Sequence, residues 1–211
     1  MPMKEDRIKT LLQASKSAGP LTVGFLLVPN FSMLAFASAL EPLRAANRMS
    51  GQNLFSWVIS SPTGAAPEAS NGVRVDVQGT PEMLQDCRLV FVCAGLEVKA
   101  HADKETLNLI RRLDRKGAII GAICTGTYLM AAAGLLDDRR CTIHWENIDG
   151  LAEEFPLLEI TNELFEIDDK RVTCSGGTAS LDMILYLIGQ VHGQGLAAQV
   201  SDQFIHDRIR D

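Results

Sequence analysis

The stretch that most constrains the fold of this chain runs from residue 116 to residue 134, with the sequence KGAIIGAICTGTYLMAAAG. The apolar run 118–123 follows a glycine, as the buried strands of parallel sheets do. Residues 127–133 are mostly good helix formers, and Gly134 suits the position just beyond a helix C-terminus. The stretch therefore predicts a buried strand, a sharp turn and a helix.

Cys124 lies at this turn, with the small residues Ala122 and Gly126 two positions before and after it. A nucleophile elbow has this pattern, because its central residue adopts a strained backbone and only small neighbours let strand and helix approach. We therefore expect an exposed thiol at a helix N-terminus, where the helix dipole and backbone N–H groups favour a thiolate or a bound anion. The alternative is that Cys124 is a small buried residue in a tight turn.

The overall composition is that of one globular domain. The 211 residues are 46% hydrophobic and 22% charged, which suffices for a single sizeable core. Acidic residues number 26 against 20 basic ones, so the net charge is −6, and no basic stripe stands out. The chain by itself is therefore a poor candidate for binding nucleic acid.

Cysteine and histidine spacing gives no sign of a metal or a cofactor. The five cysteines contain no C-x-x-C pair and the four histidines no H-x-x-x-H pair, which indicates reduced thiols, no metal site and a cytoplasmic protein. The glycine-rich stretch 121–126 lacks the ending of a phosphate-binding P-loop, and no dinucleotide fingerprint occurs, so we expect no cofactor. No signal peptide or apolar run of about eighteen residues is present, so we expect neither export nor a membrane span.

The rest of the chain predicts an α/β three-layer sandwich, with a mostly parallel central sheet flanked by helices. Residues 1–20 are expected to be a poorly structured leader or short helix, and 21–211 a single domain. Apolar runs and alternation predict strands over 21–28, 54–60, 73–77, 88–93, 118–123 and 140–143, and a hairpin of 164–168 with 171–174. Helical periodicity predicts helices over 34–46, 81–84, 104–116 and 127–133, one ending at 155, one opening at 175–178, and one from about 196. This last helix has no cap, so we expect it to run to the end of a chain that continues.

Three features are expected to meet where the parallel strands end, which is where open α/β folds bind ligands. They are Gly95, the pair Cys124 and Thr125, and His144. Backbone N–H groups near Gly95 and Thr125 suit an anion or oxyanion, and His144 is placed to pair with the thiol. The alternative for His144 is a hydrogen-bonded structural residue. Gly177, in a second glycine-rich turn, could also present its amide to a ligand; the alternative is that this glycine only allows a tight turn between strand and helix.

Several motifs carry a family resemblance: the elbow 122–126 with His144 twenty positions on, CTIHWEN at 141–147, TCSGGT at 173–178 and EPLRAAN at 41–47. The elbow resembles that of the PfpI-like, class I glutamine amidotransferase-like superfamily. The set is similar to the N-terminal sensor domain of GlxA-type regulators in the AraC family, over residues 21–211. The resemblance implies a flavodoxin-like, class I glutamine amidotransferase-like fold.

The resemblance also implies partners. It implies a homodimer and a small-molecule effector. It also implies a helix-turn-helix domain that follows this domain and is absent from this chain. DNA would then be bound only through that further domain. Regulators of arginine, carnitine and glycine betaine catabolism look most similar, so the implied effector is a small amino acid or quaternary ammonium metabolite.

One departure from the family pattern argues against catalysis. Enzymes of the superfamily place an acidic residue near the thiol, after the first strand, and the matching position here is Ala35. Glu41 lies farther along the same helix and does not match the catalytic acid. The resemblance therefore implies that Cys124 and His144 are remnants of a catalytic elbow.

Our leading hypothesis is a non-catalytic sensor of a small zwitterion. The ligand carboxylate would face the amides of Gly95, Thr125 or Gly177, and its cationic end an aromatic face. The aromatic candidates, each of which is alternatively plain packing, are Trp145, Phe31 and Tyr128. A different hypothesis is a thiol-dependent hydrolase, glyoxalase or deglycase with Cys124 as nucleophile and His144 as base. A third is a redox sensor whose elbow thiol is oxidised reversibly.

Overall fold

A six-stranded sheet forms the centre of the molecule in a computed structural model, which describes residues 19–210. Its strand order is β2-β1-β3-β4-β8-β7. The strands are β1 (Leu21–Leu27), β2 (Phe55–Ser60), β3 (Leu89–Cys93), β4 (Ile119–Ile123), β7 (Phe165–Asp168) and β8 (Arg171–Cys174). All neighbours pair in parallel except β7, which is antiparallel to β8. The predicted mostly parallel sheet and its terminal hairpin are thus confirmed.

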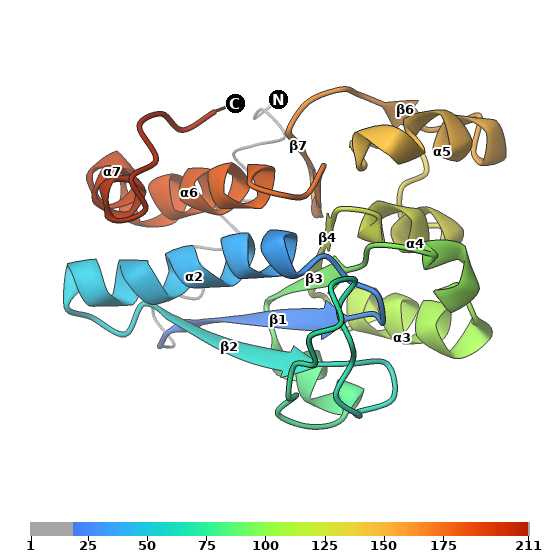
Figure 1. Cartoon of the computed structure of the whole chain (residues 1–211), viewed down its shortest axis with the longest axis horizontal. Coiled ribbons are helices and arrows are strands. Elements are labelled where there is room, and N and C mark those ends of the chain that lie inside the picture. Colours follow the sequence, from blue (N-terminus) through green and yellow to red (C-terminus); the bar gives the residue numbers. More distant parts are fainter. Residues whose placement is uncertain (1–18, 211) are drawn as a thin grey trace.

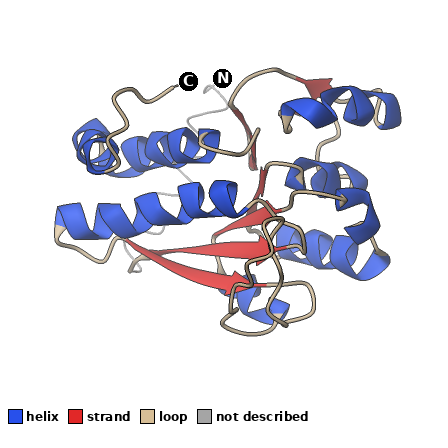
Figure 2. Ribbon diagram, in the orientation of Figure 1, coloured by secondary structure: helices blue, strands red, loops and turns tan. Residues whose placement is uncertain are grey.

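Helices cover both faces of this sheet, as Figures 1 and 2 show, which confirms the three-layer architecture. One group consists of α2 (Met33–Ser50), α6 (Ala179–His192) and α7 (Gln194–Gln203). The other group consists of α3 (Lys104–Arg115), α4 (Gly126–Ala132) and α5 (Ile148–Glu154). The described residues also form three short 3₁₀ helices: η1 (Pro81–Asp86), η2 (Val98–His101) and η3 (Trp145–Asn147).

Alternation along the strands divides the hydrophobic core into two clusters, one on each face of the sheet. Phe25 and Phe91 are fully buried on the α2 and α6 side, where their rings stack at 5.9 Å. Leu26 and Val92, the next residues along the same strands, belong to the α3 and α4 side. Burial on both faces is why these strands are almost continuously apolar in the sequence.

Residues 73–77 do not form the predicted strand. The segment makes an isolated bridge between Arg74 and Glu68 and a hydrogen bond from the Val75 N–H to the Pro67 oxygen. Val73, which alternation would bury, is 52% exposed. The alternating pattern was misleading because this segment pairs only locally, with residues 67–69, and does not extend the sheet.

The strand predicted over 140–143 is shorter and lies elsewhere. β5 (Arg140–Cys141) pairs in parallel with β6 (Glu159–Ile160) in a separate two-stranded sheet. Thr142 stays close to the main sheet because its N–H donates to Thr173 Oγ1 at 2.9 Å. This side chain bond replaces the backbone pairing that the apolar pattern suggested.

The last helix does not run to the end of the chain. α7 ends at Gln203, and Ile205 has a left-handed backbone with φ of 53°. The chain then folds back along α6, so the prediction of an uncapped, continuing helix was wrong. The expected leader, 1–20, lies outside the described residues except for its last two positions. Within 19–210, no helix combines the length and apolar character that crossing a membrane requires.

Candidate functional site

The elbow has the strained geometry that the sequence predicts. Cys124 follows β4 with a left-handed φ of 60°, and its N–H donates to the Cys174 oxygen at 2.9 Å. A Cβ on Gly126 would lie 2.1 Å from the Val92 oxygen, and one on Gly176 would lie 2.7 Å from the Cys124 Cβ. Glycine at both positions is what allows the strand, the turn and α4 to approach this closely.

The Cys124 thiol, however, is buried and not exposed as predicted. Its residue is only 6% exposed. Burial raises the pKa of the Cys124 thiol to about 11; the Thr125 N–H acts in the opposite direction, and the Glu146 carboxylate raises the pKa further. The prediction that the helix N-terminus would favour a thiolate was therefore wrong, because desolvation outweighs the single backbone hydrogen bond.

A cavity of about 790 Å³ lies over the elbow. It is lined by residues from three stretches, 95–100, 124–128 and 143–151, together with Ser32 and Ser70. Four of the predicted site residues line it: Gly95, Cys124, Thr125 and His144. The carboxyl ends of β3 and β4 thus bring Gly95 close to Cys124 and Thr125, whereas His144 reaches the cavity from the segment after β5, which is outside the main sheet.

Two predicted site residues are not among the described residues that line the cavity. Trp145 is 72% exposed, and its ring lies tilted against that of His144 at 5.8 Å. Gly177 has a left-handed φ of 56° in the turn before α6, which is the conformational role that glycine serves best. Phe31, an aromatic candidate, is fully buried and packs edge-on against Phe36.

Gly95 and Thr125 hold the β3 loop against the elbow. Thr125 Oγ1 donates to the Gly95 oxygen at 2.6 Å. A Cβ on Gly95 would lie 2.2 Å from the Asn30 oxygen, so only glycine allows the loop after β3 to approach the loop after β1. These contacts fix the edge of the cavity at which backbone amides were expected to meet an anion.

Glu146 is a site residue that the sequence reasoning did not assign. It lies on η3, lines the cavity, and places its Oε2 atom 3.6 Å from His144 Nδ1, an ion-pair distance that is too long for a hydrogen bond. Its charge also acts on the Cys124 thiol. The available signal was that Glu146 lies two positions after His144, directly after the segment 140–143 that was predicted to be a strand.

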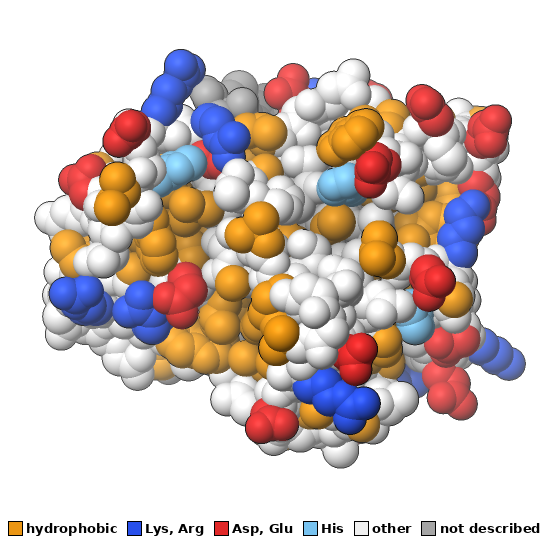
Figure 3. Space-filling model, viewed as in Figure 1, with side chains coloured by type: hydrophobic (Ala, Val, Ile, Leu, Met, Phe, Trp, Pro, Cys, Tyr) orange, Lys and Arg blue, Asp and Glu red, His pale blue; other side chains and the backbone are white. Residues whose placement is uncertain are grey.

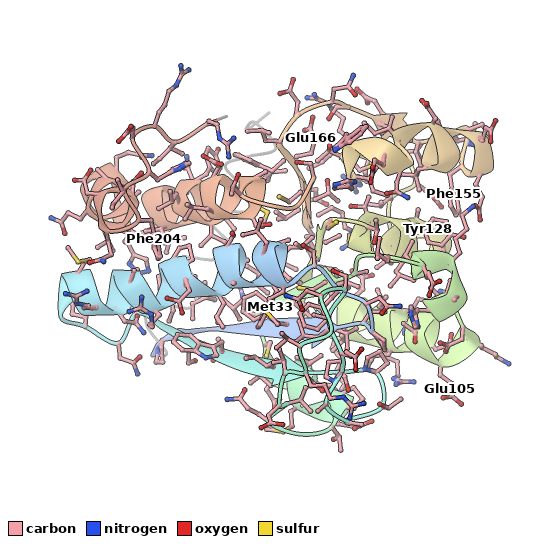
Figure 4. The ribbon with its side chains drawn as sticks, viewed as in Figure 1. Met33, Glu105, Tyr128, Phe155, Glu166 and Phe204 are labelled. Carbon is pink, nitrogen blue, oxygen red and sulfur yellow. The ribbon has the colours of Figure 1, made fainter. Side chains whose placement is uncertain are left out.

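Tyr128, one of the aromatic candidates from the sequence, lines the cavity together with Lys99, and both contact Glu154, a cluster that the sequence did not reveal. Tyr128 Oη donates to Glu154 Oε1 at 2.6 Å, and Lys99 Nζ pairs with Glu154 Oε2 at 2.6 Å. The same ammonium lies 5.5 Å from the centre of the Tyr128 ring. Burial and the Glu154 carboxylate raise the pKa of Tyr128 to about 12. Figure 4 shows Tyr128 beside Phe155, whose ring meets it edge-on at 5.8 Å.

The face drawn in Figure 3 mixes acidic, basic and hydrophobic side chains. Among residues 19–210, no group of three or more histidine, cysteine or acidic side chains is arranged to hold a metal ion.

Ala35 lies at the position where, by the family resemblance, related enzymes have a catalytic acid. It is fully buried in the same core cluster as Cys124. The acidic groups that line the cavity come from other elements, namely Glu97 and Glu146.

Comparison with known families decides the relationship, because the DJ-1/PfpI family model matches residues 38–190. The chain belongs to the DJ-1/PfpI family. Its relatives include the HTH-type transcriptional regulator CdhR of Pseudomonas aeruginosa, 49% identical over 186 residues, which are 88% of this chain and 55% of CdhR. The HTH-type transcriptional regulator GlxA of Rhizobium meliloti is 41% identical over 199 residues, 94% of this chain and 61% of GlxA.

A solved structure agrees with these relatives. An AraC family transcriptional regulator from Pseudomonas putida superposes with a TM-score of 0.80 at 28% identity, covering 88% of this chain and 100% of that one. The resemblance to GlxA-type regulators is thus confirmed, as is the α/β fold that it implied. This DJ-1/PfpI chain spans little more than half the length of its curated relatives.

Proposed function

We propose that this DJ-1/PfpI domain is the ligand-sensing part of a transcription regulator and binds a small metabolite without converting it. The observation that carries the proposal is the cavity over the elbow, whose thiol has a pKa raised to about 11. A nucleophilic cysteine needs a thiolate near neutral pH, so this thiol suits the floor of a binding site better than a reaction centre. The relatives, which are transcriptional regulators, support the same reading.

The charges around the cavity suit a ligand with a cationic end, such as a small amino acid or a quaternary ammonium metabolite. Glu97 and Glu146 both line it and are largely solvent-accessible. The cationic end would face these carboxylates and not Tyr128, whose ring already has the Lys99 ammonium over it. A carboxylate on the ligand would face the backbone N–H groups near Gly95 and Thr125, as the sequence suggested.

The remaining parts of the proposal rest on the resemblance to GlxA-type regulators. The domain would act as a homodimer, and DNA would be bound through a separate helix-turn-helix domain. The net charge of −6 supports the proposal that the DNA is bound by the separate domain and not by this one.

The Glu146→Gln variant tests the proposed role of the carboxylate. It should bind carnitine about fivefold more weakly, because a charge pair near the protein surface contributes roughly 1 kcal/mol. Isothermal titration calorimetry measures the affinity. The matched control is Glu153→Gln, which removes one exposed carboxylate from α5 outside the cavity lining and should bind carnitine as the wild type does. Equal affinity in wild type and Glu146→Gln would show that the Glu146 carboxylate does not interact with the bound ligand.

A second candidate is a thiol-dependent enzyme, which the grouping of Cys124, His144 and Glu146 favours. In that case His144 would act as base and Glu146 would orient it. Turnover of a carbonyl or amide substrate that Cys124→Ser abolishes is the behaviour that separates this function from the sensor. A reversible redox role for Cys124 is a weaker proposal, because its thiol is buried and protonated.

A further inference from the structure

The C-terminal segment, residues 204–210, is folded back onto α6 by specific contacts. α7 ends at Gln203 and Ile205 has a left-handed backbone. After α7 the chain turns back over α6 (Figure 1). The reversal is held because Ser201 Oγ donates to the His206 oxygen at 2.6 Å and the His206 N–H donates to the Ser201 oxygen at 3.1 Å. The segment is therefore a defined part of the domain surface.

Asp182, in the first turn of α6, is the anchor for this segment. Its side chain is fully buried, yet it meets two residues of the segment. His206 Nε2 lies 2.8 Å from Oδ1, and the Arg210 backbone N–H donates to the same oxygen at 2.7 Å. The Arg210 guanidinium donates to Oδ2 from Nη2 at 2.7 Å and from Nε at 3.2 Å. A buried carboxylate is costly without such partners, so α6 and the segment depend on each other.

The same segment also reaches the turn that packs on the elbow. Arg210 Nη2 donates to Thr178 Oγ1 at 2.9 Å. Thr178 directly follows the turn of Gly176 and Gly177, and Gly176 lies so close to Cys124 that its missing Cβ would be 2.7 Å from the cysteine Cβ. The 174–178 stretch thus touches the cavity floor at one end and the C-terminal segment at the other.

We propose that His206 and Arg210 on Asp182 form a latch, whose hold on residues 204–210 is coupled to the cavity through the 174–178 turn. The proposal rests on the proposed function, in which a DNA-binding domain follows this domain in the chain. A ligand over Cys124 would shift the Gly176 turn and with it Thr178, one of the two residues to which the guanidinium is bonded. Since coupling between two sites is reciprocal, opening the latch would also alter ligand affinity.

Hydrogen exchange on the Arg210→Gln variant, without any ligand, tests the latch. Loss of the charge-assisted bonds should speed amide exchange in residues 205–210 about tenfold or more. It should also speed exchange in residues 176–182, because Asp182 and Thr178 lose a partner. The matched control is Arg208→Gln, which removes an exposed charge from the same segment and should leave both regions unchanged. Unchanged exchange in 205–210 would overturn the latch, and a change confined to 205–210 would overturn its connection to the turn.

Titration with carnitine then tests the connection to the cavity. We expect the affinity of Arg210→Gln to differ from wild type by at least about fivefold, the lower end of common coupling energies, while Arg208→Gln matches wild type. Equal affinities in wild type and Arg210→Gln would overturn the coupling. If wild type does not bind carnitine, the same titration is made with whichever of arginine, glycine betaine and dimethylglycine it binds. Absence of binding by all four would overturn the proposed ligand class, whereas the hydrogen-exchange result still decides whether the latch exists.

Discussion

Alkylation of Cys124 by iodoacetamide should accelerate about tenfold for each unit of pH between about pH 7 and pH 10. The reacting species is the thiolate, and a thiol with a pKa of about 11 is ionised to only about one part in ten thousand at pH 7. The acceleration follows from proton loss alone, because the burial of the residue limits access at every pH as long as the fold persists. Peptide mass spectrometry of Cys124 gives the rate, and circular dichroism at each pH verifies the fold.

The Glu146→Gln variant sharpens this experiment. Glu146 raises the pKa of the Cys124 thiol, so its neutral replacement should move the rise in rate toward lower pH. A rate that is already constant from about pH 7 upward would mean a depressed pKa. That outcome would favour the thiol-dependent enzyme over the sensor.

Replacing Gly126 with alanine should destabilise the domain by about 3 kcal/mol or more. The new Cβ would lie 2.1 Å from the Val92 oxygen and 3.0 Å from its carbonyl carbon, both backbone atoms of a central strand that have no room to move. For a domain of this size, such a loss lowers the melting temperature by roughly 6–12 °C. Urea unfolding followed by circular dichroism measures the free energy.

Gly195→Ala is the matched control for this prediction. Gly195 lies in α7, and a Cβ there would meet nothing within 4 Å. Alanine should stabilise that helix by about 0.5–1 kcal/mol, because glycine loses more backbone entropy in a helix. Equal stability of wild type and Gly126→Ala would show that the elbow is not packed as closely as described.

The fold was readable from the sequence because burial on both sheet faces leaves an unmistakable apolar pattern. The run 118–123 and the small residues around Cys124 predicted β4 and the strained elbow, and both are present. The predicted hairpin of 164–168 with 171–174 is likewise present as β7 and β8. Patterns of this kind involve residues that are adjacent in the chain, so they can be recognised without knowledge of the tertiary structure.

The features that were missed depend on residues distant in the chain. Cys124 is buried in the core cluster on the α2 and α6 side, and Gly176, which is 52 positions away in the sequence, packs directly against it. The bonds from Arg210 to Asp182 span 28 residues, so no local pattern indicated where the last helix ends. The 73–77 alternation predicted a strand that has only residues 67–69 to pair with.

The measurement that tests the central claim most directly is calorimetric titration of the domain with arginine, carnitine, glycine betaine and dimethylglycine, followed by product analysis of each mixture. The sensor account predicts saturable binding of one compound, with that compound recovered unchanged and binding retained in Cys124→Ser. Conversion of any of the four compounds that disappears in Cys124→Ser would contradict it, as would the absence of binding by all four.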